Sequence, residues 1–240
     1  KGDGWRGTVV AHEVTRDDFV AGTLAVLGSG RISRMGGKQQ VGGTLTFAGQ
    51  GLVPTDAGVA QALGDKVDGV ATFFWQEGAA LSLPKLALNG EGYGVEAAGR
   101  IDGLTLTGRA TAVVEDMGRA ALLAGRPLAG KGVATVNGTA NLLAGSFDGE
   151  AAVSGTHLRV GQAELDSLLR GASEISASVK RDETGTTLRR LDLRATGLQV
   201  TASGTVRPAV RNVSREISAA GFTVAASSSR AGSARGPRVV

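Results

Sequence analysis

The chain has 240 residues, enough for a sizeable core in one or two domains; 38 of them are glycine and only 4% are aromatic. The absence of cysteine excludes a disulfide framework, a thiolate metal site and a cysteine nucleophile, and a hydrophobic content of 42% argues against disorder. The net charge of +4 arises in residues 207–240, which hold six arginines and one glutamate, so residues 1–206 carry a charge of −1 and lack the basic surface that nucleic-acid binding requires.

Alternation of apolar and polar residues with period two, broken by glycine, dominates the sequence and is typical of half-buried strands. It predicts strands over residues 5–12, 22–33, 40–48, 69–77, 80–88, 93–101, 104–114, 132–142, 147–158, 174–181, 186–194 and 197–206. The fold class is therefore mainly β.

Short interruptions separate some of these strands. Helical spacing occurs only over 55–64, with Thr55 as N-cap, and over 115–124 and 162–170. Dipeptides with hairpin-turn chemistry, which are candidates for turns, occur at Asn89-Gly90, Asn137-Gly138 and Asp148-Gly149.

An internal repeat of about 105 residues is the firmest structural signal in the sequence. At an offset of 105, Leu86, Leu88, Gly92, Val95, Ala97 and Gly99 coincide with Leu191, Leu193, Gly197, Val200, Ala202 and Gly204. The same offset pairs Val70 with Ile175, Phe74 with Val179 and Leu63 with Leu168, and an offset of 106 sets residues 41–52 on 147–158. In both copies the alternation changes phase, between Leu83 and Leu86 and between Leu188 and Leu191, which predicts a β-bulge in each.

The repeat divides the chain into a first β unit, 1–101, a second, 102–206, and a basic tail rich in Ser, Arg and Gly, 207–240, which we expect to be poorly ordered. The chain has no signal peptide, membrane-spanning helix or lipidation motif, and it begins at Lys1 within a strand-like run. We therefore expect it to be a segment of a longer protein.

One face of the predicted sheet is apolar and the other polar, and too few helices are predicted to cover about twelve strands. The apolar face must close on itself, pair with another sheet or remain open to an apolar ligand. We predict an elongated, curled sheet, a taco-like trough, whose interior holds lipid acyl chains. The trough residues expected from the alternation are Leu45, Phe47, Val70, Phe74, Leu83, Leu86, Leu88, Val95, Val153, Ile175, Val179, Leu188, Leu191, Leu193 and Val200.

No motif predicts catalysis, a metal site or a cofactor. Gly125–Lys131 has P-loop spacing, but Gly132 stands where Ser or Thr is needed, and a helix-to-strand connection explains the segment better. His12 and His157, the two histidines, have no neighbouring ligands or nucleophile. The cluster at 73–75 is the one exposed-looking aromatic group; with Phe74 inside, its neighbours would point outward.

Three phrases give the chain a family likeness: Leu-x-Leu-x-x-x-Gly-x-x-Val-x-Ala-x-Gly at Leu86–Gly99 and at Leu191–Gly204, the segment Leu122–Gly130, and Leu165–Ala172 before another strand. In this order, over residues 5–206, the sequence resembles the TamB family within the AsmA-like and bridge-like lipid-transfer proteins. The resemblance implies a periplasmic shaft hung from an inner-membrane anchor that lies outside this chain. It further implies phospholipid transport between the two membranes, and assembly of outer-membrane proteins and autotransporters with a TamA-like barrel.

Two other classes remain open. A secreted β-solenoid, such as an adhesin or an autotransporter passenger, would show a period of one coil of about 20–30 residues. A β-helical polysaccharide enzyme would need a cluster of carboxylates on one face, and no such cluster coincides between the two repeats.

Overall fold

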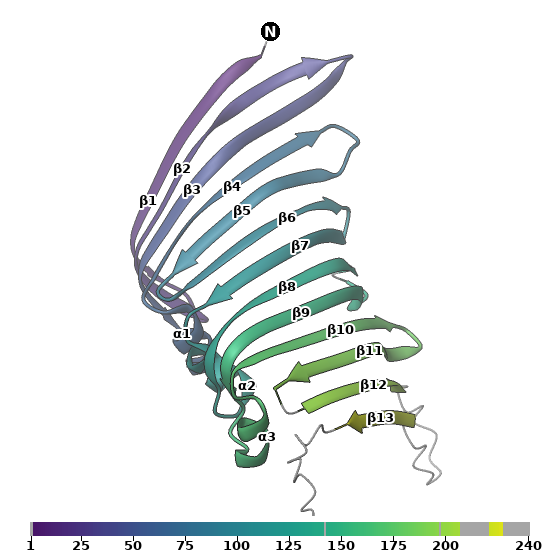
Figure 1. The fold of residues 1–240 in the computed structure, drawn as a ribbon. Coiled ribbons are helices and arrows are strands. Elements are labelled where there is room, and N and C mark those ends of the chain that lie inside the picture. Colours follow the sequence, from purple (N-terminus) through teal and green to yellow (C-terminus); the bar gives the residue numbers. More distant parts are fainter. Residues whose placement is uncertain (1, 142, 197, 207–220, 228–240) are drawn as a thin grey trace, which may run out of the picture.

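The computed structural model describes residues 2–141, 143–196, 198–206 and 221–227. They form one open antiparallel sheet of thirteen strands in which every strand pairs with the next in the chain (Figure 1). The strands are β1 (Asp3–Thr15), β2 (Phe19–Met35), β3 (Lys38–Pro54), β4 (Lys66–Gln76), β5 (Leu81–Gly90), β6 (Tyr93–Asp102), β7 (Thr105–Val114), β8 (Ala129–Asn141), β9 (Ser146–Arg159), β10 (Ala172–Asp182), β11 (Gly185–Ala195), β12 (Leu198–Val206) and β13 (Gly221–Ser227). The mainly β prediction and the twelve predicted strands are confirmed, and most strands extend a few residues beyond the predicted bounds.

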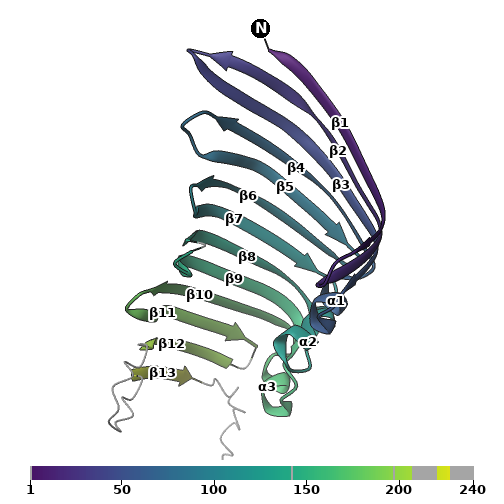
Figure 2. The same ribbon diagram turned by 180° about the vertical axis from the view of Figure 1, so that it is seen from behind.

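The strands bend along their length, most visibly β1 to β3 (Figures 1 and 2). The sheet is therefore curved rather than flat. It is continuous across the expected boundary at 101/102, because β6 and β7 pair over their whole length.

The helical segments of the described chain all lie along one edge of the sheet, at the lower left of Figure 1 and the lower right of Figure 2. They are α1 (Ala57–Leu63), the 3-10 turn η1 (Met117–Ala120) with α2 (Ala121–Ala124), and α3 (Ala163–Leu168), as predicted from the spacing. We call this edge the helix edge, and the opposite one, where the β2–β3, β4–β5, β6–β7, β8–β9 and β10–β11 turns lie, the hairpin edge. No helix in the described part of the chain has the length and hydrophobicity needed to cross a bilayer.

The N-cap of α1 is Asp56, so the prediction of Thr55 is wrong. The Asp56 side chain accepts a hydrogen bond from the backbone N–H of Val59 at 2.8 Å, whereas the Thr55 hydroxyl donates to the carbonyl of Asp17 at 3.1 Å. Two adjacent residues with capping chemistry cannot be distinguished from the sequence, and here Thr55 instead ties the helix edge to the β1–β2 turn.

The three predicted turn dipeptides are not turns. Asn89-Gly90 ends β5, while Asn137-Gly138 and Asp148-Gly149 lie within β8 and β9. The β2–β3 turn is made instead by Gly36 and Gly37, whose φ angles of 57° and 81° are the left-handed pair that a two-residue hairpin turn requires.

Within the predicted tail, residues 221–227 form β13, which pairs with Gln199–Thr205 of β12. Phe222 and Val224 alternate with Gly221 and Thr223 at the start of this segment, a short pattern within a region rich in Ser, Arg and Gly. Residues 207–220 and 228–240, also part of the predicted tail, lie outside the described residues.

The strand register assigns one row of apolar residues to a single face of the sheet. Starting at β1, cross-strand partners follow one another from each strand to the next as Gly7, Gly28, Leu45, Ala71, Leu86, Ala97, Ala110, Val136, Ala151, Ala177, Leu191 and Ala202. We call the face that carries this row the apolar face. The row beside it, on the polar face, is Thr8, Leu27, Thr46, Val70, Ala87, Glu96, Thr111, Thr135, Ala152, Ser176, Asp192 and Thr201.

Both predicted bulges are present. The β5–β6 register shifts between Leu83 and Leu86, and the β11–β12 register shifts between Leu188 and Leu191. An extra residue in one strand reverses the alternation, so the leucines on both sides of each bulge stay on the apolar face.

Few side chains are fully buried. The buried hydrophobic residues of the described chain are Ala21, Val67, Leu158 and Leu169, all close to the helix edge. A core this small does not account for an apolar row across twelve strands, so most of the apolar face has no cover within the described chain.

Candidate functional site: the apolar face

Thirteen of the fifteen predicted trough residues lie on the apolar face, and two do not. Val70 stands opposite Thr46 and Ala87, and Phe74 opposite Gly42 and Ser82, which places both on the polar face. Phe74 is 45% exposed there. The prediction for these two residues is wrong because the repeat offset of 105 equated them with Ile175 and Val179, and an error of one residue moves a side chain to the other face.

The aromatic cluster is consequently inverted from its predicted orientation. Phe73 pairs with Gly43 and Trp75 with Val41, so both rings belong to the apolar face. The error of one residue in the repeat offset explains both the wrong face predicted for Phe74 and the omission of Phe73 and Trp75 from the apolar face.

A row of four glycines crosses the apolar face from β6 to β9. Gly99 pairs with Gly108, Gly108 with Gly138, and Gly138 with Gly149. A Cβ on Gly108 would lie 2.6 Å from the carbonyl oxygen of Ala98, and one on Gly138 would lie 2.4 Å from that of Asp148. The neighbouring backbones thus approach more closely than any side chain permits, and we call these four residues the glycine row.

A cavity of about 400 Å³ lies over the glycine row. Its larger apolar lining side chains stand next to the row, on β5 and on the strands that the row crosses: Leu83, Leu86, Leu106, Val136 and Phe147. The glycines remove side chains from the floor while leucine, valine and phenylalanine stand around it. Such walls favour a linear apolar chain, because they offer burial without directional contacts.

At the β1–β4 end of the apolar face, aromatic side chains cover the glycines. The row there runs Trp5, Gly30, Gly43, Phe73, and the Trp5 and Phe73 ring centroids are 6.2 Å apart. Trp5 Nε1 donates a hydrogen bond to the carbonyl of Gly42 at 3.3 Å, and a Cβ on Gly43 would lie 2.4 Å from the indole. The Trp5 indole therefore covers the glycines at this end of the sheet, whereas the glycine row between β6 and β9 faces the open cavity.

The helix edge is held to the sheet by polar contacts around Tyr93. Its hydroxyl donates to the carbonyl of Leu63 at 3.0 Å, and the Arg119 guanidinium lies 5.6 Å from the ring centroid. Burial raises the pKa of Tyr93, with Arg119 acting in the opposite direction. Gln61 of α1 also donates to the carbonyl of Gly118, so α1 and η1 form one unit at this end of the strands.

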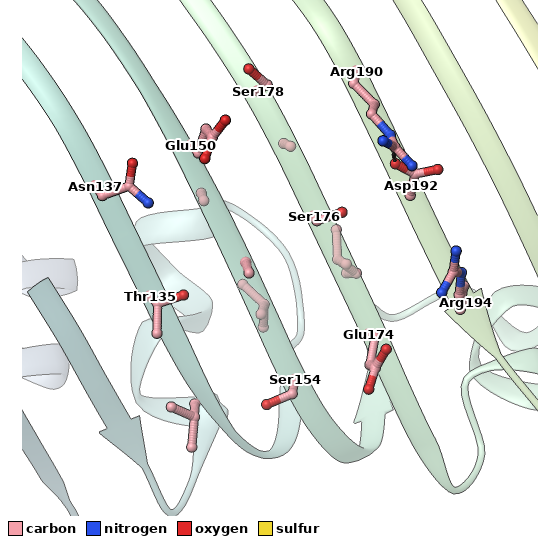
Figure 3. A pocket seen from close by; sticks show the side chains of 16 residues that line it. Thr135, Asn137, Glu150, Ser154, Glu174, Ser176, Ser178, Arg190, Asp192 and Arg194 are labelled. Carbon is pink, nitrogen blue, oxygen red and sulfur yellow. Dashed lines mark hydrogen bonds and ion pairs between the residues drawn. The ribbon is translucent and has the colours of Figure 1, made fainter. Parts of the chain in front are cut away.

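A second cavity, of about 640 Å³, lies on the polar face over β8 to β11 (Figure 3). It contains three carboxylates, each in a different cross-strand row: Glu150 opposite Ser178, Asp192 opposite Ser176, and Glu174 opposite Arg194. Arg190 is ion-paired with Asp192. The acids are therefore interspersed with arginines as a solvated charge pattern, without two carboxylates directly opposite each other.

The P-loop-like segment and the two histidines have structural roles. Gly125, with φ of 62°, ends α2, and the segment up to Lys131 leads into β8, so Gly125–Lys131 is the predicted helix-to-strand connection. His12 meets the Thr23 hydroxyl at 3.3 Å, and His157 has a positive φ of 55° at an irregular point of β9. Among the described residues no group of three or more His, Cys, Asp or Glu is arranged to hold a metal ion.

Comparisons with protein-family models, with curated proteins and with solved structures found no match to this chain.

Proposed function

We propose that this chain is a lipid-binding segment of a TamB-like protein, whose apolar face holds phospholipid acyl chains during transport between the inner and outer membranes. It would act in the periplasm as part of an inner-membrane-anchored protein and support the assembly and secretion of outer-membrane proteins with a TamA-like barrel. The observation that carries the proposal is the uncovered apolar row contributed by twelve consecutive strands.

The arrangement of the rows suits movement of lipid along the sheet. Cross-strand rows run perpendicular to the strands, so an acyl chain can pass from strand to strand over apolar side chains only. Each methylene removed from water contributes about 0.8 kcal/mol, and aliphatic walls add no directional contact that would stop it from sliding. In this proposal the segment is non-catalytic and needs no cofactor.

We further propose that the curved sheet is a taco-like trough built from two repeats. The first residues of α1 and α3 are 106 positions apart, as are two positive-φ residues, Gly51 and His157. From the bulges of β5 and β11 onward the offset is 105. The offset between the repeats thus decreases by one residue at the hairpins after β4 and β10. This decrease explains why a single offset of 105 assigned Val70 and Phe74 to the wrong face.

The antiparallel order of the sheet does not favour the β-solenoid alternative, because coils of a β-helix pair their strands in parallel. The interspersed charges of the polar cavity likewise give no opposed carboxylates for a polysaccharide enzyme. Neither alternative accounts for an uncovered apolar row.

Mass spectrometry of lipids extracted from the purified chain tests the proposal. We expect phospholipid to co-purify with the folded protein, in amounts well above those recovered with an unrelated soluble protein carried through the same preparation. A folded chain free of lipid, both as purified and after incubation with phospholipid vesicles, would overturn the lipid-binding function and favour a structural or assembly module.

A further inference from the structure

Basic side chains are rare on the apolar face, and one of them adjoins the cavity over the glycine row. Arg181 of β10 stands opposite Phe147, which lines that cavity. Two residues back along β10, Val179 stands opposite Gly149 of the glycine row. Because successive residues on one face of a strand are about 7 Å apart, the guanidinium lies within reach of the cavity at the hairpin edge.

The positive charge of Arg181 is not taken up by the acid next to it in the chain. Asp182 lies on the polar face, where Lys180 Nζ contacts it at 3.0 Å and the backbone N–H of Thr184 donates to it at 2.9 Å. These contacts, with the Thr184 hydroxyl bond as the largest, lower the pKa of Asp182 to about 2, so it is ionised and occupied at neutral pH. None of the four ion pairs between described residues includes Arg181, and its side chain is exposed.

We infer that the cavity over the glycine row binds an anionic phospholipid, with an acyl chain lying along the row and the head-group phosphate on Arg181. This inference rests on the proposed function and names the lipid class that this part of the apolar face selects. A planar guanidinium offers paired donors to a phosphate, and a net negative head group gains more from it than a zwitterionic one. A phospholipid carries an anion next to its apolar chains. Gly149 and Phe147 would contact the acyl chain, and Arg181, on the neighbouring strand opposite Phe147, would contact the phosphate.

A competition between two lipids tests the inference. The purified chain is incubated with vesicles of equal phosphatidylglycerol and phosphatidylcholine content, separated from them, and its bound lipids are quantified. We expect phosphatidylglycerol to be enriched on the wild-type chain about 2- to 5-fold over its share in the vesicle, the range of an exposed ion pair. In Arg181→Gln the ratio should return to that of the vesicle while the total lipid bound per chain is unchanged.

Arg100→Gln is the matched control, since Arg100 is an exposed arginine of β6 beside Gly99 but on the polar face, and it does not line the cavity. This variant changes the net charge equally and should keep the full enrichment. Equal loss of enrichment in both variants, or a wild-type ratio equal to that of the vesicle, would overturn the role of Arg181 while leaving lipid binding in place. A wild-type chain that takes up neither lipid would overturn the inference together with the proposed function.

Discussion

Gly108→Val is expected to lower the free energy of unfolding by about 1–3 kcal/mol. This is the usual cost of forcing extra carbon atoms into closely packed surroundings. Gly108 is at the centre of the glycine row, and its Cβ would lie 2.6 Å from the carbonyl oxygen of Ala98 and 3.1 Å from the Cα of Gly99. The atoms that would have to move are backbone atoms of the neighbouring strand. The clash therefore cannot be relieved by a change of rotamer.

Gly7→Val is the matched control, because Gly7 lies on the same face but has no atom within 4 Å of an added Cβ. It should leave the free energy of unfolding nearly unchanged. Urea unfolding followed by circular dichroism measures both variants. Equal stability of Gly108→Val and the wild type would contradict the close approach of the strands at the glycine row.

Leu88→Asp and Leu193→Asp are expected to reduce the phospholipid bound by the chain more than ten-fold when combined. Leu88 stands opposite Gly69 and Val95, and Leu193 opposite Ile175 and Val200, so each is surrounded by apolar positions of the same face. A carboxylate covered by an acyl chain has no partner there, and burying it without one costs several kcal/mol. Mass spectrometry of the extracted lipids gives the bound amount.

Phe74→Asp is the control for this experiment, since it replaces a large apolar residue by aspartate on the polar face. It should leave the bound lipid unchanged. Circular dichroism establishes that the variants keep their strand content. If Phe74→Asp lost as much lipid as the double variant, or if the folded double variant kept its lipid, the apolar face would not be the binding surface.

Much of the fold was predictable because period-two alternation and glycine carry strong local information. The strand from 93 to 101 alternates without interruption, and the structure forms β6 over nearly the same range. The phase change from Leu83 to Leu86 was sufficient to place a bulge, because a reversal of alternation on a sheet with one apolar face has few other structural solutions.

The features that escaped prediction depend on register between strands. Gly99 and Gly108 are close in sequence, but their alignment with Gly138 and Gly149 appears only when β7 and β8 pair across a connection that contains η1 and α2. The cover of Gly43 by Trp5 likewise joins strands separated by β2. The faces assigned to Val70 and Phe74 depended on whether the repeat offset is 105 or 106. Matching residue types between the two repeats could not decide between these two values.

Quenching of single tryptophans by phospholipids brominated in their acyl chains shows on which face of the sheet the acyl chains lie. The two natural tryptophans, Trp5 and Trp75, are replaced by phenylalanine, and one new tryptophan is introduced as Phe147→Trp on the apolar face or as Phe74→Trp on the polar face. We predict strong quenching of Phe147→Trp and none of Phe74→Trp, with the same lipids lacking bromine as the reference. Bound lipid that quenches both variants equally, or Phe74→Trp alone, would show that the apolar face is not the surface that holds the acyl chains.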